Sequence, residues 1–276
     1  MRDLPEGCVS HILSHTSPRD ACRCSLVSSK FRLAAESDTV WESFLPWQWP
    51  DIISRSVSPV QFSSKKALYF HLCQSPLLLD QGNKSLALDK VSGKIRCTLG
   101  TKELSILWDD DPVVWNGNLP LSYLFPFVIP FKPRLLNVSD TNDVSYLRIR
   151  ARIQAKLLSP NTTYAAYLIY VHRYGGVKHP PMRASVRLVG EGDETKVEEV
   201  VNDAYLLSTT VFRREDDGYH CQSRGDGWME IKMGEFFTTE DDMEVEIFLR
   251  GTKEYTAFMV SGLLVHGIEL RPKGPK

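Results

Sequence analysis

Residues that could perform catalysis or bind a metal are present in this chain, but not at the spacings that such chemistry needs. His11 and His15 lie four residues apart, like the zinc ligands of a helical metalloprotease motif, but Ile12 stands where that motif has its glutamate. Cys22 and Cys24 are two residues apart, with no second pair at metal-ligand spacing. We find no nucleophile elbow, phosphate-cradling glycine loop or dinucleotide fingerprint. The sequence therefore predicts no catalytic site, no metal and no other cofactor, and we interpret the chain as a non-catalytic protein.

One stretch carries a regular row of cations. Over residues 146–156, Arg148, Arg150, Arg152 and Lys156 alternate with apolar residues, so they share one face of a predicted strand. Such a face could meet phosphate, but phosphate-binding proteins usually show a wider basic excess. The whole chain has 33 Lys and Arg against 34 Asp and Glu, a formal net charge of −1. We therefore interpret this face as solvated, and expect neither nucleic acid nor a membrane surface as a partner.

The elements that must position any functional surface begin with a helical stretch, 4–46. Ser17 before Pro18 reads as an N-cap, and Asp20 is placed to complete a capping box. Asp38 is expected to cap a last helical turn. A helical stretch of about forty residues usually needs a disulfide bond, a metal or another chain to be stable. The surplus apolar surface therefore predicts a partner protein.

A short connecting helix is expected next, and after it the sequence pattern changes from helical periodicity to the alternation typical of strands. Ser63-Ser64 looks like a cap for a helix through Leu72, although Lys65 and Lys66 at its start oppose the helix dipole. Alternation over 84–88 and 95–99, with turn-forming residues between them, predicts a hairpin. Further strands are expected at 146–156, 164–174, 184–188, 205–212, 228–233, 244–249 and 258–270. The fold class is therefore α+β, a small helical part followed by an antiparallel, jelly-roll-like β-sandwich.

The helical stretch also resembles a known family. Its order of Leu-Pro, Ile-Leu, Leu-Val-Ser, Phe and Val-Trp resembles the F-box, which packs against the Skp-type adaptor of a cullin-RING ubiquitin ligase. The resemblance places seven residues at the adaptor contact or in the helix packing beneath it: Leu4, Pro5, Ile12, Leu13, Leu26, Val27 and Trp41. The alternative is that 1–46 is merely a helical cap on the larger domain.

The β part resembles the phloem-lectin domain that is shared with Nictaba-type plant lectins. The strings that carry this resemblance occur in order at 104–108 with Trp115, 146–150, 158–168, 227–231 with 234–237, and 267–272. The whole chain thus resembles plant F-box proteins with a phloem-lectin domain. We expect an F-box at 1–46, a helical connector at 47–79 and a lectin-like β-sandwich at 80–276.

That resemblance implies binding of N-acetylglucosamine oligomers or of the core of N-glycans. A sugar ring offers an apolar face that stacks on indole, while its hydroxyls need a few polar partners. Trp108 and Trp115 match the family's paired binding tryptophans in spacing, and Glu230 or Glu235 could accept hydrogen bonds from sugar hydroxyls. Alternatively, both indoles belong to the core. Residues 253–258 depart from the family's pattern, which leaves retention of sugar binding open.

The predicted strand at 228–233 offers a second candidate tryptophan site. Alternation puts Trp228, Glu230 and Lys232 on one face and Met229, Ile231 and Met233 on the other. If the methionine face is core, an indole and a carboxylate share the outer face. The alternative is a tryptophan that covers the sheet beside a solvated glutamate.

Two functions from different classes follow from these observations. In the first, the chain is the substrate receptor of a ubiquitin ligase, with a Skp-type adaptor, a cullin reached through it, and a glycan or glycoprotein target as partners. In the second, it is a cytoplasmic lectin or scaffold whose F-box no longer engages the adaptor. With no signal-peptide run and no membrane span, we expect a cytoplasmic or nuclear location and reduced cysteines.

Overall fold

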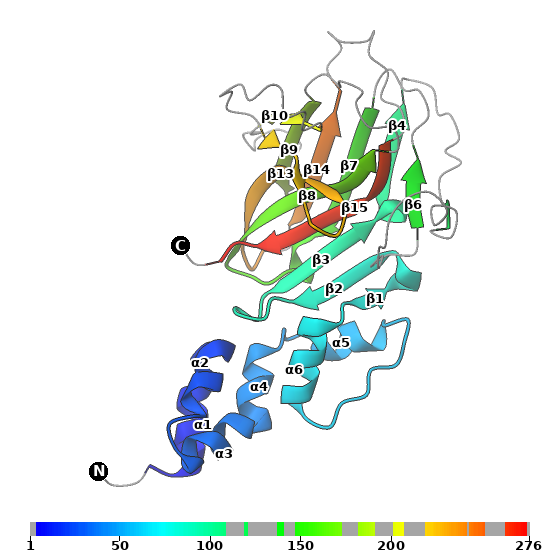
Figure 1. The fold of residues 1–276 in the computed structure, drawn as a ribbon. Coiled ribbons are helices and arrows are strands. Elements are labelled where there is room, and N and C mark those ends of the chain that lie inside the picture. The colour runs from blue at the N-terminus through cyan, green and yellow to red at the C-terminus, as the bar shows by residue number, and fades with distance from the viewer. Residues whose placement is uncertain are drawn as a thin grey trace. The chain divides into compact units, whose positions relative to one another are not determined.

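The computed structural model describes residues 4–108, 119–120, 137–140, 147–172, 182–190, 201–206, 219–241, 243–251 and 263–274. For 107–108, 119–120, 137–140, 172 and 219–220 it describes the backbone alone. The chain forms two units (Figure 1), one of Met1–Gln81, Leu86–Arg96 and Gly274–Lys276 and the other of Gly82–Ser85 and Cys97–Lys273. We call them the helical unit and the β unit. Within the described residues no helix has the length and apolarity that crossing a membrane requires.

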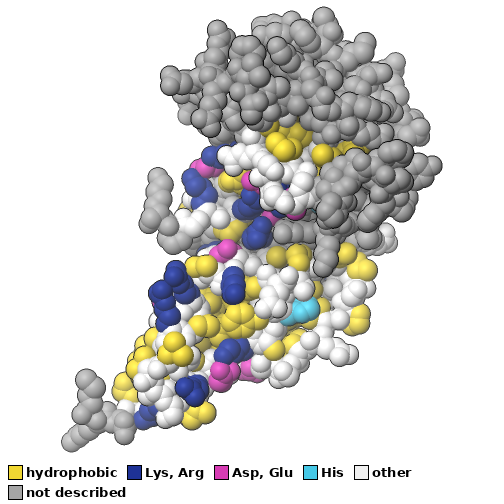
Figure 2. All heavy atoms as spheres, viewed as in Figure 1, with side chains coloured by type: hydrophobic (Ala, Val, Ile, Leu, Met, Phe, Trp, Pro, Cys, Tyr) yellow, Lys and Arg dark blue, Asp and Glu magenta, His cyan; other side chains and the backbone are white. Residues whose placement is uncertain are grey.

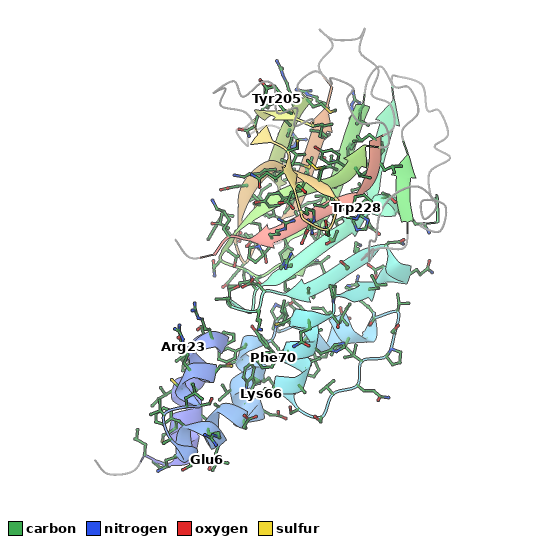
Figure 3. All side chains as sticks on the ribbon, in the orientation of Figure 1. Glu6, Arg23, Lys66, Phe70, Tyr205 and Trp228 are labelled. Atoms are coloured by element: carbon green, nitrogen blue, oxygen red, sulfur yellow. The ribbon has the colours of Figure 1, made fainter. Side chains whose placement is uncertain are left out.

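The helical unit is built around one indole. Its helices are α1 (Glu6–Ser14), α2 (Pro18–Cys24), α3 (Ser29–Glu36), α4 (Asp38–Phe44), α5 (Trp49–Ser54) and α6 (Lys65–Gln74), with strand β1 (Leu77–Leu79) after them. Trp41 on α4 is fully buried, and its Nε1–H donates to the Ala35 carbonyl at 2.6 Å. The rings of Phe44, Tyr69 and Phe70 pack around it with centroids 5.2–5.7 Å away. Phe70 is labelled among the side chains of Figure 3. The predicted connecting helix, α6, thus shares a core with α4.

The serine caps are confirmed, with one change of detail. Ser17 Oγ accepts the Asp20 backbone N–H at 3.1 Å, and Ser64 Oγ accepts the Ala67 N–H at 3.1 Å. In the predicted capping box the Asp20 carboxylate would accept a backbone N–H of Ser17. Instead, it accepts the Ser17 hydroxyl at 2.7 Å.

The expected role of Asp38 was wrong. Asp38 is the first residue of α4 rather than its cap, and the N-cap, Ser37, makes no side-chain cap hydrogen bond. The Asp38 carboxylate instead accepts the backbone N–H of Lys65 at 2.8 Å, at the start of α6. An anion at a helix N-terminus is favourable, so Asp38 offsets the unfavourable lysines there. Lys65 Nζ itself lies 3.3 Å from the centre of the Trp49 ring, and Lys66 pairs with Glu36 at 2.5 Å.

The β unit consists of two mostly antiparallel sheets. Strands β2 (Lys84–Leu88) and β3 (Ile95–Gly100) form the predicted hairpin and are divided between the two units, since Leu86–Arg96 belongs to the helical unit. The other strands of the β unit are β4 (Leu104–Trp108), β5 (Leu119–Pro120), β6 (Asn137–Asp140), β7 (Leu147–Gln154), β8 (Thr162–His172), β9 (Met182–Val189), β10 (Val201–Tyr205), β11 (Tyr219–His220), β12 (Gln222–Ser223), β13 (Met229–Thr238), β14 (Glu244–Arg250) and β15 (Leu263–Pro272). From β3 onward the first sheet has the order β3-β15-β8-β13-β12, with β6 also pairing with β15, and the second sheet has the order β11-β10-β9-β14-β7-β4. This confirms the α+β class and the predicted sandwich. Of the predicted strand at 205–212, residues 207–212 lie outside those described, as do 258–262 of the last one.

The inner faces of the two sheets form the core of the β unit. On the second sheet the alternating residues of β7 and β14 are buried, including Ile149, Ala151 and Ile247. On the first sheet Leu168 and Met233 are buried in the same way. Gly234 on the first sheet lies close to Val186 on the second, so a Cβ on Gly234 would lie 2.8 Å from the Val186 Cγ2 atom. The buried faces leave the outer faces of both sheets for polar residues.

Candidate functional site

The seven residues expected at the adaptor contact divide into an exposed set and a buried set. Leu26 is 80% exposed, Val27 70%, Leu4 53% and Ile12 51%, whereas Leu13 and Trp41 are buried. Pro5 is exposed at the start of α1. The buried pair holds the helices together, and the exposed set forms what we call the apolar surface of the helical unit: Leu4, Pro5, Ile12, Leu26 and Val27.

Local structure explains why these side chains point outward. Leu26 and Val27 follow α2 in a turn, where their backbone N–H groups donate to the carbonyls of Arg23 and Cys24 at 3.1 and 3.0 Å. On α1, Val9 and Leu13 are four residues apart and face the core, so Ile12 is turned about 100° away from Leu13. Figure 2 shows apolar side chains gathered over this part of the helical unit. Exposed apolar residues at this density on a small unit mark an interaction surface.

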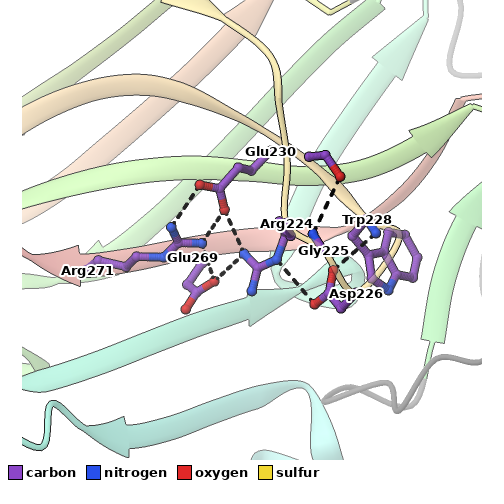
Figure 4. A network of polar contacts seen from close by, with 8 residues as sticks. Arg224, Gly225, Asp226, Trp228, Glu230, Glu269 and Arg271 are labelled. Carbon is purple, nitrogen blue, oxygen red and sulfur yellow. Dashed lines mark hydrogen bonds and ion pairs between the residues drawn. The ribbon is translucent and has the colours of Figure 1, made fainter.

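The outer face of the first sheet carries a network of four alternating charges (Figure 4). Arg224, from the loop between β12 and β13, donates through Nη1 to Glu230 Oε2 at 2.9 Å and to Glu269 Oε2 at 2.8 Å. Arg271 on β15 donates to both oxygens of Glu230, at 3.0 and 2.5 Å, and to Glu269 at 2.8 Å. The predicted site residue Glu230 is therefore held between two guanidinium groups.

Burial and pairing act in opposite directions on Arg271. Burial by itself lowers the pKa of this guanidinium, but its hydrogen bonds to Glu230 and Glu269 outweigh that effect and raise the pKa. The guanidinium also lies 4.4 Å from the centre of the Tyr167 ring, a cation–π distance. The network is thus a fixed, charge-balanced structure, in which both oxygens of Glu230 are already occupied.

Trp228 lies beside this network and is covered. Its side chain is 4% exposed, packs on Ile169, and lies 4.9 Å from the His266 ring between centroids. The adjacent cavity of about 20 Å³, lined by Trp228, Arg224 and Thr98 among others, has room for a water molecule and not for a sugar ring. The predicted alternation of β13 is confirmed, since Ile231 and Met233 are buried while Glu230 and Lys232 are partly exposed. The indole, however, covers the sheet rather than offering a binding face.

Glu235 shares the outer face with Glu230 because the strand is irregular between them. Strict alternation would put residues five apart on opposite faces. The register of β13 on β8 shifts between Lys232, opposite Tyr167, and Gly234, opposite Ala166, so Glu235 comes to lie opposite Ala165. Sequence reasoning missed this bulge, for which Gly234 is the available signal. Hydrogen bonds from Lys232 and then Lys273 lower the pKa of the Glu235 carboxyl.

The tryptophan pair expected to bind sugar falls largely outside the described residues. The backbone of Trp108 ends β4, opposite Leu147 on β7, and so belongs to the second sheet. The side chain of Trp108 and the whole of Trp115 lie outside the described part. Glu230 and Glu235 belong to the first sheet. Within the described residues no three His, Cys, Asp or Glu side chains gather as metal ligands.

Comparison with known proteins gives two family matches, F-box-like over residues 1–45 and phloem protein 2 over residues 94–272. Similar relatives come from Arabidopsis thaliana. F-box protein At2g02240 is 38% identical over 98% of this chain and 79% of its own length, and F-box protein PP2-B10 is 36% identical over 98% and 93%. F-box protein VBF is 36% identical over 99% of this chain and its full length. The chain therefore belongs to the phloem protein 2 family, with an F-box-like domain ahead of its phloem protein 2 domain.

Proposed function

We propose that this chain is the substrate-recognition subunit of a Skp-cullin-F-box ubiquitin ligase. The observation that carries the proposal is the apolar surface of the helical unit, where Leu26 and Val27 are 80% and 70% exposed above a core made by Leu13 and Trp41. A Skp-type adaptor that covers this surface would bring the cullin with it. The match of residues 1–45 to the F-box-like family supports the same partner.

The energetics of such a contact are favourable. Fully burying a Val, Leu or Ile side chain is worth about 1.5–3 kcal/mol. Because Leu4 and Ile12 are half exposed and the other two more so, each can add roughly 1–2 kcal/mol when an adaptor covers it. Association also costs several kcal/mol in lost freedom of motion. Loss of one such contact is therefore expected to weaken binding measurably, and loss of two to abolish it in a pull-down.

The chain itself needs no catalytic residue in this role. The F-box-like unit would hold the adaptor, and the β unit would hold a target near a ubiquitin-loaded enzyme supplied by other subunits. Proximity then provides the rate increase. We further propose that the target is held through N-acetylglucosamine oligomers or an N-glycan that stacks on Trp108 and Trp115. The presence of a phloem protein 2 domain supports that proposal. We place the protein in the cytoplasm or nucleus.

The adaptor contact is tested by co-purification of the full chain with a Skp-type adaptor. Ile12→Asp should weaken capture of the adaptor, and the double change Leu26→Asp with Val27→Asp should abolish it. Val57→Asp is the matched control, because Val57 belongs to the same unit and is 52% exposed, as Ile12 is 51% exposed. If the double variant retains the adaptor with an unchanged melting temperature, the proposal is overturned. The remaining alternative is then that the chain is a cytoplasmic lectin or scaffold.

The sugar proposal needs a separate test. Trp115→Ala should weaken binding to N-acetylglucosamine oligomers by about 1–3 kcal/mol if the indole is a stacking anchor. Isothermal titration measures this, with adaptor capture by the same variant as the control for folding. Equal affinity in wild type and variant, or absence of binding in both, would contradict a sugar site at this tryptophan.

A further inference from the structure

Three adjacent strands of the second sheet place arginines in rows on its outer face. Residues directly opposite each other in an antiparallel sheet share a face. Strand β14 lies between β9 and β7 (Figure 1), and the register gives three rows across them: Arg187–Glu246–Arg152, Ser185–Phe248–Arg150 and Arg183–Arg250–Arg148. The sequence predicts a solvated face for the β7 arginines, and in the structure Arg150 and Arg152, though partly exposed, also share the carboxylate of Glu246 on β14.

The first row shows how this face holds an anion. The Glu246 side chain is fully buried, and its Oε1 atom accepts from Arg150 Nε at 2.6 Å and Arg152 Nε at 2.8 Å. Its Oε2 atom accepts from Arg187 Nε at 2.6 Å. The Arg150 and Arg187 guanidinium groups also flank the Phe248 ring, at 5.1 and 5.7 Å from its centre. The arginines of the first two rows are thus fixed in place by the protein's own carboxylate.

The third row, like the first, has arginines on its two outer strands. Its central residue on β14 is Arg250, whereas that of the first row is Glu246. Arg250 stands directly between Arg183 and Arg148, and like charges in opposite positions destabilise a sheet. Arg183 and Arg250 are exposed, and among the residues that the structure describes neither has a salt bridge. A hollow of about 360 Å³ opens here, lined by Arg148, Arg183, Arg187, Arg250, Ser185 and Phe248 among others.

We propose that this hollow binds a phosphate monoester. Arginine forks bind phosphate oxygens in a bidentate manner, and a monoester carries close to two negative charges at neutral pH, which suits the adjacent guanidinium groups of the third row. Glu246 carries one negative charge and is shared among Arg150, Arg152 and Arg187, all outside the third row. The partly exposed Phe248 ring provides an apolar wall for the organic part of the ligand, and the hollow has the volume of a small-molecule site.

The ester can come from a small molecule or from a phosphorylated side chain, since both present the same group. The full chain is titrated calorimetrically at constant ionic strength with inorganic phosphate, glucose 6-phosphate and a phosphoserine peptide, with glucose as the ligand that lacks phosphate. We expect saturable binding of at least one phosphate ester and none of glucose. Tighter binding of glucose 6-phosphate or of the peptide supports the site and identifies the source.

Three variants distinguish specific binding in the hollow from nonspecific electrostatic attraction of anions. Arg250→Gln should weaken binding at least tenfold. Arg250→Lys keeps the positive charge but loses the paired N–H donors of the guanidinium group, so it should also weaken phosphate binding, by a smaller factor. Lys102→Gln removes an exposed cation from elsewhere on the β unit and should change affinity less than twofold. Equal effects of Arg250→Gln and Lys102→Gln, or no saturable binding of any ester, would overturn the proposal.

The site is independent of the proposed ligase function. Arg250→Gln removes a cation from between two others, so the variant is expected to melt no lower than wild type. It should also retain a Skp-type adaptor as wild type does. Loss of phosphate binding with adaptor capture intact therefore reports on the hollow alone.

Discussion

Replacing Glu246 with glutamine is expected to destabilise the β unit strongly. In the wild type a fully buried carboxylate accepts from Arg150 and Arg152 on one oxygen and from Arg187 on the other. The variant keeps one acceptor oxygen but turns an NH₂ group, itself a donor, towards an arginine donor. It also removes the negative charge that holds three adjacent cations together.

The size of the effect follows from burial. Breaking a buried ion pair by removing one partner costs about 3–5 kcal/mol. The arginine side chains are 35–50% exposed, so water can compensate in part, and we expect about 2–4 kcal/mol. For a unit of this size that corresponds to a fall in melting temperature of roughly 4–16 °C. Glu244→Gln is the matched control, because Glu244 is on the same strand but 29% exposed and 3.6 Å from Arg152, a contact worth about 0–1 kcal/mol.

The assay is thermal and urea unfolding of the full chain, followed by far-ultraviolet circular dichroism and by calorimetry to resolve the β-unit transition. A double-mutant cycle with Arg187→Gln then measures how much of the loss belongs to that pair. If Glu246→Gln melts within a degree or two of Glu244→Gln, the carboxylate is not holding the arginine rows, and the reasoning about this face fails.

Three further predictions rest on single groups that are buried or partly buried. Gly234→Ala should cost about 1–3 kcal/mol in urea unfolding, because its Cβ would lie 2.8 Å from Val186 Cγ2, and Val186→Ala should restore most of the loss; absence of rescue would contradict the proposed clash. Burial raises the pKa of the Cys73 thiol to about 11, so alkylation at pH 8 should be roughly 100-fold slower in the folded chain than in urea, as mass spectrometry of the Cys73 peptide will show; equal rates would refute this. Burial raises the pKa of Tyr164 from 10.0 to about 12, so the folded state holds that proton more tightly; the stabilisation is complete below pH 10 and is lost as the pH rises to 12, a change of about 2.7 kcal/mol. Tyr164→Phe leaves the Ser159 N–H without its 3.0 Å acceptor and should be less stable at pH 7, yet should lose less stability than wild type between pH 9 and 11.5; parallel losses would contradict the assignment.

Local signals predicted the elements of this fold well. The caps at Ser17 and Ser64 were readable because a serine before a helix accepts a nearby backbone N–H, whatever the rest of the chain does. Strict alternation likewise predicted β7 and the buried residues Ile231 and Met233 of β13. Such signals depend on residues within about four positions of each other, so they survive without knowledge of the tertiary structure.

Features that depend on distant residues were missed. Asp38 is a residue type that often caps its own helix, but its carboxylate accepts the backbone N–H of Lys65 at the start of α6, 27 residues later in the sequence. Trp228 looks exposed by alternation, yet it is covered where it packs on Ile169 and beside His266. The bulge that puts Glu235 beside Glu230 is visible only in the pairing of β13 with β8. In each case a local rule was correct for the isolated segment and was overridden by packing.

The arginine rows show why an average over the chain can hide a local site. The net charge of −1 argued against a phosphate-binding face, because acids and bases balance over 276 residues. Strand pairing places these charges unevenly on the sheet. Glu246 on β14 binds Arg150, 96 positions away in sequence, and Arg250 on the same strand lies between Arg148 and Arg183. The same strand thus adds a negative charge to one row and a positive charge to another. Local charge on a sheet is determined by strand register, so a chain with almost no net charge can still present a site for an anion.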